Sequence, residues 1–241
     1  AVCVRDQESK DSLARVGFPA DRVEVTADLV LALTGDMIPA AAARQADELL
    51  GHAAPEVRRL GMHVQSGGEK EGRFDGYLQA LGPLLRDRED VEPIFFFDHG
   101  EPDMESFGRR IEKHLPRARL LPAQPHWTLA AILGRFDAVI TTKLHVGITA
   151  WTLGVPPCGF SVYHGKTSRF YRQIGREEFQ APLSDDPTKL VEWVRAFLEE
   201  PDRFGSESPT AREELPRLAR RNFEVIDEQL GDILRKAGDR N

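Results

Sequence analysis

Apolar and polar residues follow one another along this chain in short blocks whose period changes repeatedly. Short apolar runs rich in β-branched and aromatic residues predict strands at residues 2–4, 23–25, 60–64, 93–97, 118–121, 138–140 and 157–162. Between them, apolar residues recur at helical spacing, which predicts helices at residues 8–16, 74–85, 104–115, 126–134, 144–153, 167–174, 188–199 and 212–237. Strands that alternate with helices indicate an α/β protein with Rossmann-like parallel sheets, covered by helices on both faces.

Changes in composition suggest how the chain is divided. Residues 36–55 contain two prolines and a run of alanines, which predicts a linker, although residues 40–50 also fit a helix. The chain has no initial Met and a strand begins at once, so we expect the back part of a longer protein with an incomplete first domain. The predicted parts are the tail of an N-terminal Rossmann-like domain, the linker, a C-terminal Rossmann-like domain and a closing helix, at residues 1–35, 36–55, 56–205 and 206–241.

The most informative stretch is residues 137–154, where a predicted buried strand gives way to a helix that ends at Gly154. Lys143 and His145 fall at the end of that strand and in the first turn of that helix. Open α/β sheets bind ligands at this edge, and free N–H groups and the helix dipole favour an anion there. A fixed cation and a titratable imidazole at this junction indicate a phosphorylated or carboxylated substrate. The alternative is that His145 only bonds a neighbouring carbonyl and Lys143 is merely solvated.

Composition narrows the possible classes of function. The 241 residues carry a net charge of −7, which argues against a general nucleic-acid binder. No apolar run approaches the ~18 residues of a membrane span, and no signal peptide is visible. Cys3 and Cys158 are too few and too scattered for a disulfide framework or a zinc site. We therefore expect a cytoplasmic protein, with the inner face of the membrane as an alternative place of work.

Two other polar groups have competing interpretations. Asp98, His99, Glu101 and Asp103 follow a strand, but their spacing matches no metal-ligand pattern, so a surface loop is favoured over a metal site. The glycine-rich residues 66–72 fit neither common phosphate-binding motif, and a surface loop is again favoured.

Three segments of the chain resemble the polysaccharide pyruvyl transferase family. The first segment resembles the family's middle segment and reads V-C-V-R-D-Q-E-S-K-D-S-L-A-R-V-G, followed by V-E-V-T-A-D-L-V-L-A-L. The second segment, residues 136–156, is similar to the most characteristic stretch of the family and reads F-D-A-V-I-T-T-K-L-H-V-G-I-T-A-W-T-L-G-V-P. The family usually has Arg-Leu-His where this chain has Lys-Leu-His. G-F-S-V-Y-H-G-K-T-S-R-F-Y-R-Q-I-G at residues 159–175 resembles the tyrosine–lysine segment that follows.

The resemblance implies a fold similar to two-domain GT-B glycosyltransferases, with residues 56–205 as the donor-binding domain and the closing helix packed back across the cleft. It also implies an activity. Members transfer the pyruvyl group of phosphoenolpyruvate onto a sugar of a polysaccharide or its precursor as a ketal, and release phosphate. Phosphoenolpyruvate is a co-substrate, and neither a cofactor nor a metal is implied. The expected partner is a glycan or a lipid- or nucleotide-linked sugar.

Site residues follow from the matching positions. His145 matches the motif histidine, which implies general acid/base catalysis or a phosphate contact, and Arg5 matches an arginine that holds the donor. Lys143 stands where arginine is usual, so it keeps the charge and loses the fork that grips an anion in two places. Lys166 and Tyr163 match the later segment and imply further substrate contacts. Each has a non-functional alternative. Arg5 could form only a surface ion pair with Asp6, Lys166 could only begin its helix, and Tyr163 could face solvent.

Two other functions remain open from the residues alone. One is a sugar-nucleotide-dependent glycosyltransferase of the same fold class. The other is a non-catalytic domain that binds a phosphorylated ligand or a glycan, to which the replacement of arginine by Lys143 gives some support.

Overall fold

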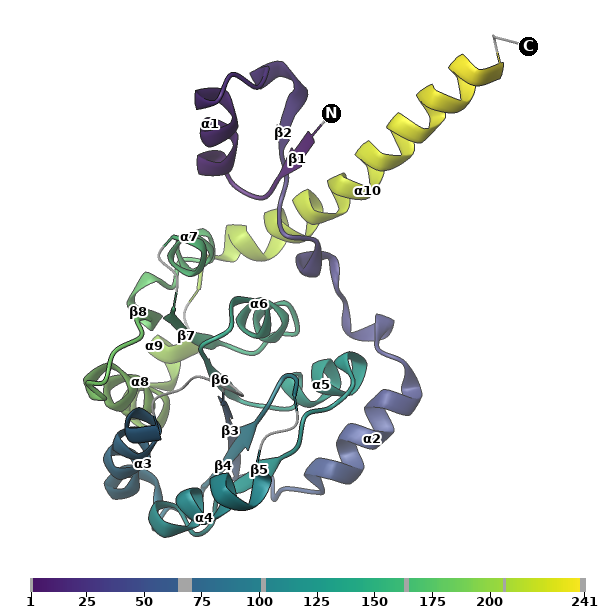
Figure 1. The fold of residues 1–241 in the computed structure, drawn as a ribbon. Helices are drawn as coiled ribbons and strands as arrows, with labels where there is room; N and C mark the ends of the chain where they lie inside the picture. The colour runs from purple at the N-terminus through teal and green to yellow at the C-terminus, as the bar shows by residue number, and fades with distance from the viewer. Residues whose placement is uncertain (1, 65–70, 101–102, 163–164, 206, 239–241) are drawn as a thin grey trace. The chain divides into compact units, whose positions relative to one another are not determined.

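The computed structural model describes residues 2–64, 71–100, 103–162, 165–205 and 207–238, which fold as two compact units (Figure 1). The smaller unit combines Ala1–Leu33 with Ser208–Asn241, and the larger unit is Thr34–Glu207. Among the described residues, no helix is both long enough and apolar enough to cross a membrane.

A parallel sheet of six strands forms the centre of the larger unit. The strands lie in the order β5-β4-β3-β6-β7-β8, and every neighbouring pair is parallel. Their bounds are Arg58–His63 (β3), Val91–Phe96 (β4), Arg119–Leu121 (β5), Ala138–Thr141 (β6), Pro157–Ser161 (β7) and Gln180–Pro182 (β8). The short edge strand β8 was not predicted, because three residues that end in proline carry almost no strand signal.

Helices cover both faces of this sheet (Figure 1). On one side α3 contacts α4 and α8, and on the other α5 contacts α2 and α6, which in turn contacts α7. The helices of this unit are η3 (Gly35–Met37), α2 (Ala40–Leu50), α3 (Glu71–Leu85), α4 (Met104–His114), α5 (His126–Leu133), α6 (Leu144–Thr152), α7 (Lys166–Gln173), η4 (Glu177–Phe179), α8 (Thr188–Glu199) and α9 (Pro201–Gly205).

The predicted linker at residues 36–55 contains helix α2, which belongs to the core of the larger unit. Ala46 and Leu50 are 0% and 2% exposed and lie in one apolar cluster with residues of α5, such as Ala131. An alanine-rich segment has high helix propensity, but most of the stability of such a helix comes from packing its apolar face against another element. The compact unit accordingly begins at Thr34, upstream of the helix.

The smaller unit joins the two ends of the chain. Strands β1 (Val2–Val4) and β2 (Val23–Val25) pair in parallel around helix α1 (Gln7–Arg15) and η1 (Ala20–Arg22), and η2 (Leu29–Ala32) follows. Helix α10 (Pro209–Gly238) packs against η2. The family resemblance implies that this helix packs back across a cleft, and that placement remains a prediction.

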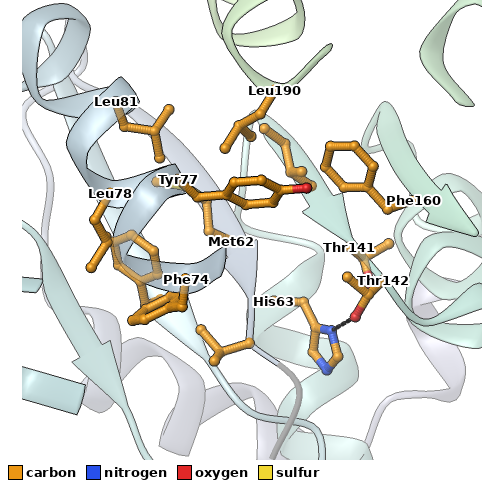
Figure 2. A pocket seen from close by; sticks show the side chains of 13 residues that line it. Met62, His63, Phe74, Tyr77, Leu78, Leu81, Thr141, Thr142, Phe160 and Leu190 are labelled. Carbon is orange, nitrogen blue, oxygen red and sulfur yellow. Dashed lines mark hydrogen bonds between the residues drawn. The ribbon is translucent and has the colours of Figure 1, made fainter. Parts of the chain in front are cut away.

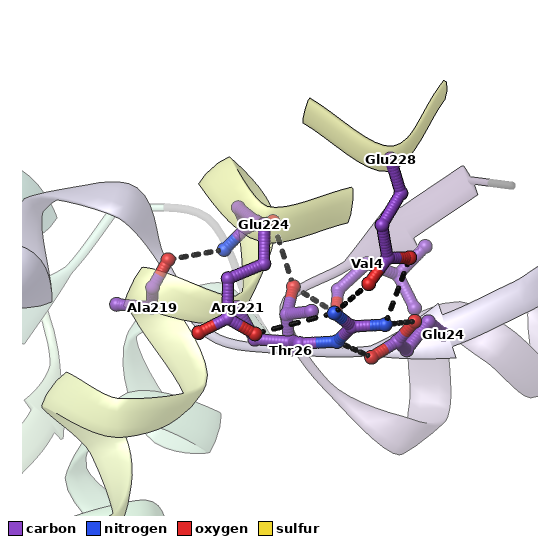
Figure 3. Close-up of polar contacts among 8 residues, drawn as sticks. Val4, Glu24, Thr26, Ala219, Arg221, Glu224 and Glu228 are labelled. Carbon is purple, nitrogen blue, oxygen red and sulfur yellow. Dashed lines mark hydrogen bonds and ion pairs between the residues drawn. The ribbon is translucent and has the colours of Figure 1, made fainter. Parts of the chain in front are cut away.

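Polar contacts attach α10 to the strand β2 (Figure 3). Arg221 Nε donates to Glu24 Oε1 at 2.6 Å, and the same guanidinium also pairs with Glu224 and Glu228. Asn222 is buried, and its Oδ1 accepts from Thr26 Oγ1 at 2.8 Å. Because a buried amide is costly unless it is bonded, Asn222 fixes the register of the helix against the end of β2.

Substitution of Gly159 tests the packing of β7 against α7. A Cβ atom at Gly159 would lie 2.6 Å from the Tyr171 hydroxyl oxygen, and Tyr171 is itself buried, with 1% of its surface exposed. We expect Gly159→Ala to lower the free energy of unfolding in urea by about 1–3 kcal/mol. The matched control is Gly76→Ala in α3, where no atom lies within 4 Å and a gain of up to about 1 kcal/mol is expected. Equal stability of the two variants would contradict this account.

Candidate functional site

The order of the strands creates a crevice at the carboxyl edge of the sheet. From β3 the chain proceeds outward to β4 and β5, and it then returns to place β6 on the other side of β3. Ligands of open α/β sheets bind where the direction of winding reverses in this way. Here that point lies beyond the ends of β3 and β6, where His63 and the turn Thr142–Lys143 are found.

A local hydrogen-bond pattern turns the chain from β6 into α6. Thr141 Oγ1 accepts from the backbone N–H of Lys143 at 2.9 Å and lies 3.2 Å from the Lys143 carbonyl oxygen. Threonine side chains compete in this way with strand pairing and end the strand. Lys143 then occupies the N-cap position without a side-chain cap, so the first turn of α6 can offer N–H groups and its dipole to an anion.

A nearly buried carboxylate, Asp98, connects the strand ends. Its Oδ1 accepts from His63 Nε2 at 2.9 Å and from His99 Nδ1 at 2.7 Å, and its Oδ2 pairs with the Lys143 ammonium. The Asp98 side chain is 7% exposed and that of His63 is completely buried. The other ring nitrogen of His63, Nδ1, lies 3.3 Å from Thr142 Oγ1.

These partners decide the charge of Asp98. Burial raises the pKa of the carboxyl, but hydrogen bonds from His63, Lys143 and His99 outweigh burial and hold the pKa well below its ordinary value. Asp98 is therefore a carboxylate at neutral pH, and it forms part of the electrostatics of the crevice.

Two cavities open beside this carboxylate. The first has a volume of about 240 Å³ and is lined by His63, Asp98, His99, Thr142, Lys143, Leu144, Val162, Lys166 and Thr167. The second has a volume of about 250 Å³ and is lined by Asp98, His126, Leu129, Ala130, Leu133, Lys143, His145, Val146 and Thr149. We refer to them as the lysine cavity and the histidine cavity. Lys143 and Asp98 line both, so the two cavities are neighbours.

Figure 2 shows a third, smaller cavity of about 50 Å³. Apolar and aromatic side chains such as Phe74, Tyr77 and Phe160 line most of it, with His63 and Thr142 at one end. It is the smallest of the three cavities, and its largely apolar lining offers few groups that could hold a charged donor.

The structure brings together three of the predicted site residues. Lys143 and Lys166 are both exposed and line the lysine cavity. His145 is also exposed and lines the histidine cavity beside Lys143, so its ring is not enclosed in apolar packing. His126 at the start of α5 lines the same cavity, and the neighbouring Trp127 is 36% exposed.

Two further site residues were predicted, Arg5 and Tyr163. Arg5 belongs to the smaller unit, where its Nη1 lies 3.3 Å from Asp28 Oδ2 and its Nε 3.8 Å from Asp6 Oδ2. Its side chain is 29% exposed. Tyr163 lies outside the described residues, as does most of the glycine-rich loop at residues 66–72.

Sequence reasoning missed two members of the site. The prediction of a surface loop is wrong for Asp98, because histidine and lysine partners from other strands enclose it. His63 falls inside the strand predicted at residues 60–64 and was not a candidate site residue, and the signal that could have found it is its place near the carboxyl end of that strand. Among the described residues, no cluster of three or more His, Cys, Asp or Glu side chains is arranged to hold a metal ion.

The lowered pKa of Asp98 predicts a pH-dependent contribution to stability. A carboxylate whose pKa is lower in the folded state stabilises the fold above about pH 4, and this contribution is lost as the pH falls below that value. We expect Asp98→Asn to lower the free energy of unfolding by about 1–3 kcal/mol at neutral pH, with the difference shrinking in urea titrations below about pH 4.

The control for this experiment is Asp75→Asn. Asp75 pairs with Arg110 at 2.8 Å but is 51% exposed, so its loss should cost about 0–1 kcal/mol. A difference between wild type and Asp98→Asn that stays constant from neutral to acidic pH would contradict the assignment.

Comparison with solved structures reveals the fold class. UDP-GlcNAc 2-epimerase from Neisseria meningitidis, bound to UDP-GlcNAc, matches with a TM-score of 0.67 at 12% identity, over 92% of this chain and 59% of that one. The epimerase from Methanocaldococcus jannaschii gives 0.66 at 9% identity, over 93% and 61%. HepE from Anabaena, in complex with UDP and glucose, gives 0.53 at 14% identity, over 98% and 63%.

These matches confirm the predicted α/β class with Rossmann-like parallel sheets of the GT-B-like type. The chain spans about three fifths of the length of those proteins. No curated protein matches the sequence. The sequence model of polysaccharide pyruvyl transferases, however, matches residues 1–164, more than half of the chain and the part that contains Arg5, Lys143 and His145. The chain therefore belongs to the polysaccharide pyruvyl transferase family.

Proposed function

We propose that this chain binds phosphoenolpyruvate at the carboxyl edge of β3 and β6 and transfers its pyruvyl group to a sugar as a ketal. The observation that supports this most directly is that Lys143 lines both cavities. A donor held by the Lys143 ammonium would lie next to the exposed imidazole of His145.

The lysine cavity suits a small, strongly anionic donor. Phosphoenolpyruvate carries a phosphate and a carboxylate, and Lys143 and Lys166 supply two ammonium groups at the same cavity. The uncapped first turn of α6 adds backbone N–H groups of the right polarity. Each of these contacts is electrostatic and gains strength as the donor displaces water from the crevice.

The reaction requires one proton donor near the donor's double bond. In the proposed mechanism, His145 gives a proton to the methylene carbon, and positive character develops on the neighbouring carbon. One sugar hydroxyl adds to that carbon and gives up its proton. The bond from the same carbon to the phosphate oxygen then breaks, phosphate leaves with the bonding electrons, and a second hydroxyl adds and loses its proton to complete the ketal.

Lys143 and Arg5 require separate consideration. A lysine at the position where the family has arginine is a point charge, so it can neutralise the donor but cannot grip two oxygens in a fixed plane. We therefore expect a lower donor affinity than an arginine would give. The proposed role of Arg5 as a donor ligand rests on its place in the family motif, and it is tested by substitution.

The acceptor is proposed to be a glycan or a lipid- or nucleotide-linked sugar, bound in the cytoplasm or at the inner face of the membrane. Both Cys3 and Cys158 are unpaired thiols, which is consistent with a reducing compartment.

A second candidate is a sugar-nucleotide-dependent glycosyltransferase. Structures with the same fold are described in complex with UDP, UDP-GlcNAc or UDP-glucose, which favours it. A third candidate, a domain that binds a phosphorylated ligand without turnover, is consistent with the replacement of arginine by Lys143.

Removal of the proposed proton donor tests the mechanism. We expect His145→Ala in the natural full-length protein to reduce phosphate release from phosphoenolpyruvate and an acceptor sugar by about 10²–10⁴-fold, because general acid catalysis is lost. Arg5→Ala should reduce it as well, mainly by raising KM for the donor.

The matched control is His52→Ala, at an exposed histidine between α2 and β3 that lines neither cavity. Turnover should be unchanged in this variant. Wild-type turnover in His145→Ala would remove the histidine from the mechanism.

Thermal stabilisation discriminates the donor classes. A ligand that binds only the folded state at about 100 times its Kd adds about 2.7 kcal/mol to the free energy of unfolding. We expect phosphoenolpyruvate to raise the Tm of the protein, and a UDP-sugar to leave it unchanged. The reverse pattern would favour the glycosyltransferase, and a shift by phosphoenolpyruvate without turnover would favour the binding domain.

A further inference from the structure

The crevice contains a negative charge that an anion-binding site does not need. Asp98 lines both cavities, and its side chain is only 7% exposed. A carboxylate at this place repels a phosphate or carboxylate ligand, and its burial is costly unless several donors compensate it. A contribution to donor affinity therefore does not explain its presence.

Its hydrogen bonds indicate a different role. Both carboxylate oxygens are engaged, Oδ1 by two imidazoles and Oδ2 by the Lys143 ammonium. Lys143 is thus tied to the end of β4, although its own backbone lies at the end of β6.

A second route leads from Asp98 to the same turn. The buried ring of His63 donates or accepts at both nitrogens, with Asp98 Oδ1 at 2.9 Å on one side and Thr142 Oγ1 at 3.3 Å on the other. The ring also packs on Phe96, with centroids 5.6 Å apart. The carboxylate, the imidazole and the hydroxyl therefore form a chain that ends at the residue immediately before Lys143.

We propose that Asp98 is a positioning residue, which sets where the Lys143 ammonium stands between the two cavities, directly through its ion pair and indirectly through His63 and Thr142. The inference deepens the proposed function, on which its kinetic consequences rest. A lysine has a flexible four-carbon stem and no preferred plane, so its charge needs an external anchor that a bidentate arginine needs less.

Steady-state kinetics of the natural full-length protein separates this role from its alternatives. In Asp98→Asn we expect kcat to fall by about 10–100-fold because the cation is misplaced. KM for phosphoenolpyruvate should stay constant or fall, because a repulsive charge has been removed. Asp98→Glu keeps a carboxylate and should recover part of kcat. An unchanged kcat in Asp98→Asn, or a rise in KM that accounts for the whole loss, would overturn the proposal.

The matched control is Asp90→Asn. Asp90 lies just before the opposite end of β4, and its Oδ2 pairs with Arg88 at 2.6 Å, so the substitution removes a paired aspartate away from both cavities. Both kcat and KM should equal the wild-type values at a temperature where all variants are folded.

A measurement without substrate keeps the inference independent of the proposed reaction. The ion pair holds the Lys143 Nζ against the Asp98 carboxylate and away from a reagent, so Lys143 should react about three- to tenfold faster with acetic anhydride in Asp98→Asn than in wild type. Mass spectrometry of the digested protein gives the rate, with Lys189 as the internal reference. Equal Lys143 rates would overturn the positioning role even if the transferase is active. A faster rate would uphold the ion pair even if the protein does not turn over phosphoenolpyruvate, in which case only the proposed function has failed.

Discussion

The parallel pairing of β3 with a neighbour on each side is the constraint on which the rest of the structure depends. In the register of these pairs His63 lies opposite Phe96, and Met62 lies opposite Ile140. Side chains two residues beyond each of those partners, Asp98 and Thr142, therefore emerge at the same edge as His63. The backbone hydrogen bonds of the sheet thus assemble the polar crevice before any side chain contributes.

Local patterns were sufficient for most of the larger unit. The apolar face at residues 188–199 predicts α8 with the bounds that the structure shows, and the strand-to-helix junction is found within one residue at each point. Such segments carry their own signals in periodicity, caps and breakers. Residues 40–50 fit a helix, but nothing in their sequence indicates that helix α2 packs in the core, and the three residues of strand β8 carry almost no strand signal.

The site was less predictable, because its members come from distant parts of the chain. His63 precedes Asp98 by 35 residues, and Lys143 follows it by 45. The pattern around Asp98 indicates only that a strand ends there, and a polar strand end is ordinarily solvated. Only the strand order, which no local pattern encodes, reveals that a buried imidazole and an ammonium from other strands meet at this carboxylate. The resemblance found Lys143 and His145 because those two residues belong to one contiguous motif.

The fold itself does not distinguish a pyruvyl transferase from the enzymes that share it. At identities of 9–14%, the epimerases and HepE match the sheet and its helices, so the difference in chemistry must lie in the side chains at the strand ends. In this chain the side chains at this edge include two exposed lysines, several histidines and one nearly buried carboxylate. The Asp98 carboxylate offsets part of the positive charge that Lys143 and Lys166 offer to an anionic donor. In the proposed function, the Asp98–Lys143 ion pair lowers the affinity of the site for an anion but fixes the position of the ammonium, and position contributes more to group transfer than affinity does.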